Sequence, residues 1–208
     1  YAYQPHVMWI EVQGGFFEKI ALDGTPVEAP RRARVQPRQI YSYAVAGLLG
    51  WDGPWKQALE HGLDFYLSKY RRPDGFMRTL VASDGSPLDD KVDLYDQAFG
   101  LFGLAMASSV LPERADLPAL ATSLRDALYA TLKHPIAGFE ESVPRSLPLL
   151  SNPHMHLFEA SLAWVEAGGD PQWRAMADEI AELALSKFID PKSGGLREYY
   201  DGDWNPAP

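Results

Sequence analysis

The stretch that decides the fold is "DLYDQAFGLFGLAMAS", residues 93–108, which predicts a helix that is apolar on nearly every side. Such a helix is typically buried on both sides, because it has no broad polar face to present to water. Two stretches of the same kind flank it, "QPRQIYSYAVAGLLG" at residues 36–50 and "NPHMHLFEASLAWVEAGG" at residues 152–169. The three begin roughly 60 residues apart, and a steady step of this size indicates a repeat architecture.

A second type of helix is predicted after each of these, at residues 54–70, 117–133 and 171–188. Apolar residues recur there at a spacing of three to four with charged residues between them, which predicts amphipathic helices with one solvent-exposed face. Pro54, Pro118 and Pro171 lie at or near the starts, where a missing N–H is harmless. Short Gly-containing, strand-like segments follow at residues 72–87, 134–143 and 190–203, and a fourth, "GGFFEKIALDGTPV" at residues 14–27, precedes the first helix.

Alternating inner and outer helices predict an all-α fold, an α/α toroid in which the inner ring lines a cavity. An open solenoid and an irregular helical bundle are the alternatives. Three pairs would be half of a six-pair (α/α)6 barrel. We therefore expect residues 1–208 to be a single catalytic domain, the N-terminal portion of such a barrel, cut short at its C-terminus and, as an open point, at its N-terminus.

Composition excludes several classes of partner. The formal net charge of −9 and the absence of a long Lys/Arg cluster argue against nucleic acid, which needs a basic footprint. No apolar run is long enough to span a bilayer, so a membrane partner is not expected. The chain has no Cys and no signal-peptide pattern at its start, and we expect it in the cytoplasm.

Polar residues on the third apolar helix form the first candidate site. Asn152 is a good N-cap before Pro153, and this register puts His156 and Glu159 on one stripe with Asn152. His154 then points to the opposite side. The pair of histidines reads either as one capping and one core histidine, or as a site in which His156 exchanges protons near neutral pH and Glu159 orients it. A metal site is disfavoured, because histidines two apart diverge on a helix.

The other two apolar helices carry further candidates. Arg38, four residues after Arg34, either pairs with a core carboxylate or faces the cavity and stabilises an oxyanion. On the middle helix Tyr95 and Gln97 are candidate ligands for a polyhydroxylated molecule, and Asp93 is explained equally well as a helix cap.

In this order and spacing, "GGFFEKIALDGTPV", "RRARVQPRQIYSYA", "LYDQAFGLFGLA" and "NPHMHLFEA" resemble the N-acylglucosamine 2-epimerase superfamily of sugar epimerases and isomerases. The resemblance spans essentially the whole chain. It implies an (α/α)6 barrel that moves the C2 proton of an aldose through an enediol and needs neither cofactor nor metal. The "NPHMH" form looks more like the mannose isomerase and cellobiose epimerase branches than the animal N-acylglucosamine epimerases.

Four residues match family positions. Arg38 matches the substrate-clamping arginine, Tyr95 and Asn152 match sugar-binding residues, and His156 matches a catalytic histidine. Gln97 stands where the cellobiose branch tends to carry His, which favours a monosaccharide as the substrate.

The chain departs from the family pattern in its other histidines. The resemblance implies two more catalytic histidines in the second half of the barrel, but His6, His61 and His134 lie in no such motif. We therefore expect this chain to be a fragment of a polypeptide nearer twice its length.

The leading functional hypothesis is therefore a C2 proton-transfer enzyme of the mannose isomerase or N-acylglucosamine 2-epimerase type. His156 would be an acid/base, Arg38 would polarise the carbonyl, and Asn152, Tyr95, Glu159 and Gln97 would bind the sugar. One alternative is an α/α-toroid glycoside hydrolase or lyase, with carboxylates drawn from Asp93, Asp96 and Glu159. A non-catalytic sugar- or protein-binding scaffold is another, and a homodimer is left open.

Overall fold

The computed structural model describes residues 14–207; residues 1–13, which include His6, and residue 208 lie outside the described part. The described chain alternates between two kinds of helix. The first helices of the three pairs are α1 (Val35–Leu48), α3 (Leu94–Val110) and α5 (Ser151–Glu166). The second helices are α2 (Trp55–Lys69), α4 (Leu117–Thr131) and α6 (Pro171–Leu183), the last running into a π-helical turn, Ala184–Phe188.

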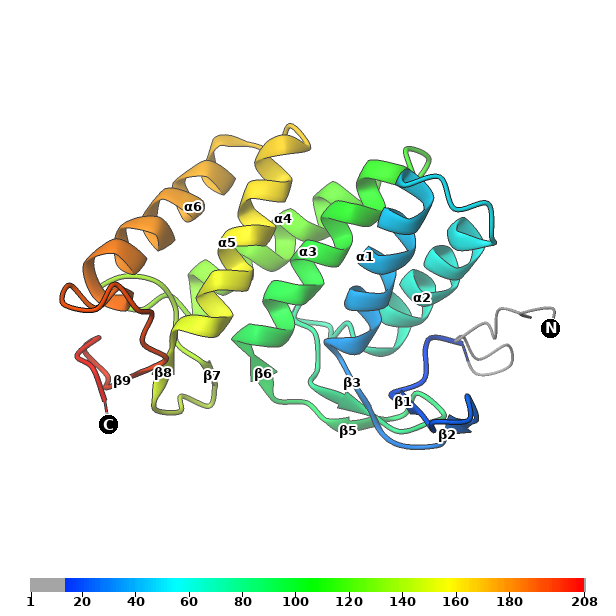
Figure 1. Cartoon of the computed structure of the whole chain (residues 1–208), viewed down its shortest axis with the longest axis horizontal. Helices are drawn as coiled ribbons and strands as arrows, with labels where there is room; N and C mark the ends of the chain where they lie inside the picture. Colours follow the sequence, from blue (N-terminus) through cyan, green and yellow to red (C-terminus); the bar gives the residue numbers. More distant parts are fainter. Residues whose placement is uncertain (1–13, 208) are drawn as a thin grey trace.

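The first helices form one layer. Helix α3 lies between α1 and α5 and packs against both, while α2, α4 and α6 pack on α1, α3 and α5 respectively (Figure 1). The predicted inner and outer roles are confirmed. The main core fills the space between the layers, and the central helix α3 supplies the largest share of its buried residues.

Short antiparallel strand pairs close one end of the array, where the inner helices begin (Figure 1). The strand that leads into each inner helix pairs with a strand that follows the outer helix of the same unit. The pairs are β3 (Arg31–Arg32) with β4 (Leu80–Val81), β6 (Val92–Asp93) with β7 (Ser142–Val143), and β8 (Leu149–Leu150) with β9 (Tyr199–Tyr200). Strand β5 (Pro87–Asp89) extends the first pair, and β1 (Lys19–Ile20) pairs with β2 (Pro26–Val27) in the first hairpin.

Each inner helix buries in its first turn a polar side chain that binds the backbone of the glycine-containing hairpin packed beneath it. The three contacts are Gln36 with Phe16, Gln97 with Met77 and His154 with Phe139. Both glutamines accept the N–H and donate to the C=O of their partner, whereas His154 accepts the Phe139 N–H at Nε2, 3.0 Å away. The contact satisfies backbone groups that would otherwise be buried without a partner.

The starts of two inner helices differ in how they are capped. Asp93 caps α3 through its Oδ1, which accepts the N–H of Tyr95. The prediction that Asn152 caps α5 is wrong, because that helix begins two residues earlier than predicted and its N-cap position is Leu150, which has no side-chain acceptor. The strand β8 runs directly into the helix, and its pairing with β9 decides where the helix starts.

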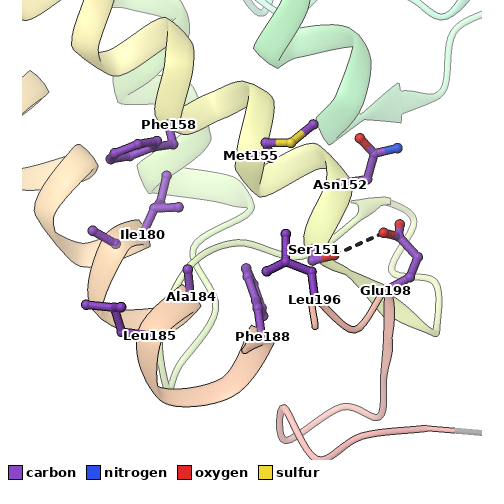
Figure 2. Close-up of a pocket in the computed structure, with 11 residues that line it drawn as sticks. Ser151, Asn152, Met155, Phe158, Ile180, Ala184, Leu185, Phe188, Leu196 and Glu198 are labelled. Atoms are coloured by element: carbon purple, nitrogen blue, oxygen red, sulfur yellow. Dashed lines mark hydrogen bonds between the residues drawn. The ribbon is translucent and has the colours of Figure 1, made fainter. Parts of the chain in front are cut away.

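The face of α5 and α6 that points away from α3 is open and apolar. A cavity of about 420 Å³ lies there between α5, α6 and the π-helical turn, with Asn152, Met155 and Leu196 in its lining (Figure 2). Leu185 and Leu196 are 72% and 70% exposed beside it. Separately, none of the helices in residues 14–207 is both long and apolar enough to cross a membrane.

Candidate active site

Side chains from all three inner helices meet in one pocket of about 400 Å³ near the strand-bearing end. It is lined by Arg38, Tyr41 and Ser42 of α1, Phe99 and Phe102 of α3, and His156 and Glu159 of α5. Tyr95 lies next to it and contacts both Arg38 and His156. The structure therefore brings together four of the six predicted site residues.

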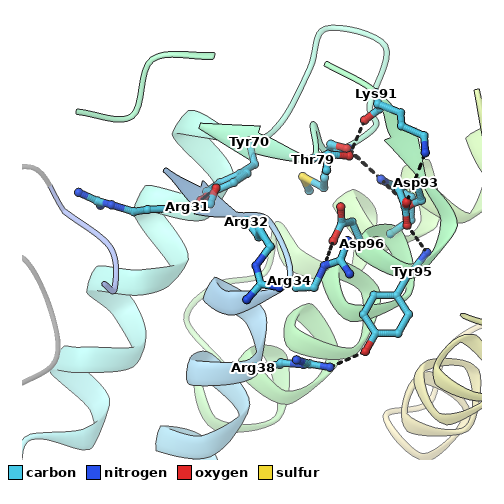
Figure 3. Close-up of polar contacts among 12 residues, drawn as sticks. Arg31, Arg32, Arg34, Arg38, Tyr70, Thr79, Lys91, Asp93, Tyr95 and Asp96 are labelled. Atoms are coloured by element: carbon cyan, nitrogen blue, oxygen red, sulfur yellow. Dashed lines mark hydrogen bonds and ion pairs between the residues drawn. The ribbon is translucent and has the colours of Figure 1, made fainter. Parts of the chain in front are cut away.

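Arg38 and Tyr95 are joined directly. The Arg38 Nη2 donates to the Tyr95 hydroxyl oxygen over 2.6 Å (Figure 3). The guanidinium carbon lies 4.1 Å from the centre of the Phe99 ring. Arginine has donors and no acceptor, so the Tyr95 oxygen accepts here and keeps its own proton for another partner. The pair therefore presents a fixed positive charge and a free O–H donor side by side.

His156 is held from two sides. Its Nδ1 lies 2.8 Å from the Glu159 Oε2, and its ring packs edge-on against Tyr95 with 5.2 Å between the ring centres. The imidazole is also 4.4 Å from the centre of Phe99. Because the Glu159 carboxylate accepts a hydrogen bond from the N–H at Nδ1, the other ring nitrogen, Nε2, is the one able to accept a proton.

A buried ion pair supports Tyr95 from beneath. Arg34 Nε lies 2.8 Å from Asp96 Oδ1, and its guanidinium carbon is 4.7 Å from the centre of the Tyr95 ring (Figure 3). Asp96 is fully buried, and this burial raises the pKa of its carboxyl to about 6, against the lowering influence of Arg34. The core carboxylate therefore pairs with Arg34, while Arg38 binds the Tyr95 hydroxyl instead.

Two of the predicted site residues lie elsewhere. Gln97 does not line the pocket: it is fully buried, and both ends of its amide are bound to the backbone of Met77, so its predicted contact with a sugar is corrected to a structural one. Asn152 stands one turn before His156 on α5, but it lines the open apolar cavity beside Met155 and Glu198 (Figure 2).

The two histidines of α5 divide as their helical spacing predicts. His154 is fully buried, and burial lowers the pKa of its imidazole to about 4. Its Nε2 accepts the Phe139 N–H, so its Nδ1 carries the hydrogen and donates to the Leu150 carbonyl. His154 is therefore a neutral core histidine, and His156 is the one in the pocket.

The family model of N-acylglucosamine 2-epimerase (GlcNAc 2-epimerase) matches residues 15–208. The chain belongs to this family. As a member of the N-acylglucosamine 2-epimerase family it is 51% identical, over 198 residues, to "Mannose-6-phosphate isomerase" of Rhizobium meliloti (strain 1021), an alignment that covers 94% of this chain and 51% of that protein.

It is also 30% identical over 200 residues to "D-mannose isomerase" of Thermobifida fusca, covering 88% of this chain and 47% of that protein. Cellobiose 2-epimerase from Spirochaeta thermophila DSM 6192 shares the fold, with a TM-score of 0.87, 21% identity, and coverage of 96% of this chain and 53% of that one. The chain thus spans about half the length of the curated relatives it matches.

Two aromatic residues that line the pocket were not identified from the sequence. Phe99 and Phe102 line the pocket, and Arg38 and His156 both pack against the ring of Phe99. They follow Tyr95 at helical spacing, four and seven residues on, and this stripe is the signal that could have found them. The described residues contain no group of three or more His, Cys, Asp or Glu placed to hold a metal ion.

Proposed function

We propose that this protein is a sugar isomerase or epimerase that moves the C2 proton of an aldose through an enediol. The observation that carries the proposal is the Arg38–Tyr95 hydrogen bond beside His156 in a single pocket. The names of the two curated relatives support mannose, free or phosphorylated at O6, as the substrate and a ketose as the product.

The chemistry divides among three side chains. His156 Nε2 takes the proton as the C2–H bond breaks, and the bonding electrons form the C1–C2 double bond of the enediol. The aldehyde oxygen gains negative charge, which the Arg38 guanidinium stabilises, while the Tyr95 O–H donates to a neighbouring sugar oxygen. Transfer of the O2 proton to O1, with return of the carbon-bound proton from His156 to C1, gives the ketose. Delivery of a proton by a second acid to the opposite face of C2, with the C1 carbonyl re-formed, gives the 2-epimer.

The residues around this trio have supporting roles. Glu159 accepts from Nδ1 and stabilises the imidazolium that forms on His156. Phe99 and Phe102 provide an apolar wall for a C–H face of the sugar ring. Asn152, on the open cavity one turn away, is assigned to a more distant hydroxyl.

We infer further that residues 1–208 are part of a larger (α/α)6 barrel. Within residues 14–207, α3 has an inner helix on each side and α5 has one on one side only; the open face of α5 is apolar, with a cavity of about 420 Å³. Further helix pairs of the same kind would cover this face and close the wall of the pocket. Experiments on activity are therefore designed for the complete polypeptide that carries these residues.

The contacts argue against a glycoside hydrolase or lyase. Of the carboxylates considered for it, Asp96 is fully buried against Arg34, and Asp93 is engaged as the cap of α3. Of these three carboxylates Glu159 alone remains, and glycoside hydrolysis needs two carboxyl groups. The cytoplasmic location and the homodimer stay predictions from the sequence.

Proton NMR in deuterated water tests the proposal. Mannose, mannose 6-phosphate, fructose, glucose and N-acetylglucosamine would each be incubated with the complete protein. We expect deuterium at C2 together with interconversion of mannose and fructose, or of their 6-phosphates. Deuterium confined to N-acetylglucosamine would move the reaction to 2-epimerisation, and no exchange with any sugar would refute the proposal and favour a binding scaffold.

A further inference from the structure

Glu141 is a buried carboxyl that the proposed chemistry does not use. It stands directly before β7 and is 8% exposed. Its Oε1 accepts the N–H of Leu150 over 2.6 Å, and its main-chain carbonyl accepts the N–H of Leu94 over 2.8 Å. Leu94 is the first residue of α3, and Leu150 immediately precedes α5, so one residue binds the starts of two inner helices.

These two helix starts carry the site. Tyr95 is the second residue of α3, and His156 lies less than two turns into α5. Their rings pack edge to face with 5.2 Å between centres, and this contact is sensitive to any shift of one helix along the other. Glu141 binds the main-chain N–H of Leu150, the N-cap residue of α5, from another part of the chain.

The repeat shows what is particular to Glu141. Thr79 and Glu198 stand at the equivalent places before β4 and β9, and their carbonyls likewise accept from Ala33 and Ser151 at the ends of the paired strands. Their side chains bind differently: Thr79 donates to the Lys91 carbonyl, and Glu198 accepts from the Ser151 hydroxyl. Of the three, Glu141 is the one whose side chain accepts a main-chain N–H at the start of the next inner helix.

We propose that Glu141 is a positioning residue for the proposed isomerase reaction, holding α3 through its main chain and α5 through its side chain so that His156 and Tyr95 keep their working separation. The inference rests on the proposed function. Glu141 acts through the two helices and touches neither substrate nor the reacting atoms.

The charges around Glu141 make this role depend on pH. The carboxylates that face it are Asp93 from β6, Glu198 from before β9, and its neighbour Glu140, which pairs with Arg145. Asp93 lies 3.8 Å from Lys91 Nζ. Burial, with these charges adding to it and the Leu150 N–H opposing, raises the pKa of Glu141 to about 8. Ionisation above that pH places a new negative charge among like charges between the two helices.

Glu141→Gln is the discriminating variant, because glutamine keeps the size and the acceptor but cannot ionise. With the complete protein at pH 7, we expect kcat and KM within about twofold of wild type. Between pH 7 and 9.5 the wild type should lose activity with a midpoint near pH 8, and Glu141→Gln should not. Glu140→Gln removes the neighbouring charge and leaves Glu141 in place, so it is the matched control: it should still lose activity at alkaline pH, with the midpoint moved to lower pH because Glu140 adds to the raised pKa of Glu141.

Glu141→Leu removes the acceptor itself. We expect kcat to fall by about tenfold or more with a smaller change in KM, because misalignment of a catalytic group acts mainly on the chemical step. Should this variant not fold, the pH profile of Glu141→Gln remains the test. The proposal is overturned if Glu141→Gln keeps the alkaline loss, or if a folded Glu141→Leu has unchanged kcat and KM.

A readout that is independent of activity separates this proposal from the function. Amide hydrogen exchange at Leu150 should speed up in Glu141→Leu and stay near wild type in Glu141→Gln and Glu140→Gln. If the wild type turns over no sugar, the proposed function fails, and the amide exchange still tests whether Glu141 holds the start of α5. Unchanged exchange in Glu141→Leu would refute the positioning role even in an active enzyme.

Discussion

Arg38 donates to the Tyr95 hydroxyl over 2.6 Å, although 57 residues separate the two along the chain. The contact links the first turn of α1 to the first turn of α3 and lies on the ring of Phe99. Such a contact exists only when two repeat units stack in one register. The contact therefore shows that stacking of the repeat units brings polar side chains of different units together in one site.

The first prediction concerns this guanidinium. Arg38→Lys keeps the charge but loses the fork that serves Tyr95 and a substrate oxygen together, so we expect kcat/KM for the complete protein to fall on the order of 100-fold. Steady-state kinetics with the substrate identified by NMR measure it. Arg32→Lys is the matched control, because Arg32 is an exposed arginine paired with Glu18, and it should leave kcat/KM unchanged.

The second prediction concerns the acid/base. His156→Ala should lower the rate of C2 deuterium exchange by about 100- to 10,000-fold, the range for loss of a general acid or base. The thermal midpoint should stay close to wild type, since the side chain lies in an open pocket. Exchange at the wild-type rate in this variant would remove His156 from the mechanism.

A third prediction follows from the repeated contact between inner helix and hairpin. In the other two repeats the position equivalent to His154 is a glutamine, Gln36 or Gln97. His154→Gln should therefore retain nearly the full free energy of unfolding. His154→Leu leaves the Phe139 N–H buried without an acceptor and should cost about 1–3 kcal/mol. Urea unfolding monitored by tryptophan fluorescence compares the two; equal stability of Gln and Leu variants would contradict the structural role.

The fourth prediction is a pH dependence at Asp96. Burial raises its pKa from 3.8 to about 6, so the folded protein binds a proton there that the unfolded chain has lost between these pH values. Its contribution to stability is therefore fully present below pH 4 and falls as the pH rises to 6, by up to about 3 kcal/mol.

Asp96→Asn cannot titrate and isolates this contribution. The free energy of unfolding of the wild type minus that of Asp96→Asn should decrease between pH 4 and 6, as measured by urea unfolding across the range. An increase with pH would mean that the Arg34 charge outweighs burial and that the carboxylate is ionised throughout. Asp126→Asn, at an exposed carboxylate paired with Arg125, serves as the comparison.

The amino-acid sequence alone determined the order and the kind of the helices. Apolar periodicity separates the inner helices from the outer ones, and both properties are local, because they depend on residues within one or two turns. The same spacing predicts that His154 and His156 lie on different faces of their helix. Asp93 as a helix cap is equally local.

Tertiary structure decided which polar groups meet. The sequence places the guanidinium groups of Arg34 and Arg38 on the same helix face. In the structure Arg34 forms the ion pair with Asp96, and Arg38 donates to the Tyr95 hydroxyl. Gln97 was expected to bind sugar, but the hairpin that carries Met77 packs beneath α3, and its main chain hydrogen-bonds the Gln97 side-chain amide. The start of α5 was set by the pairing of β8 with β9, some 50 residues later along the chain. These outcomes depend on side-chain direction and on strands distant in sequence, and a local pattern contains neither.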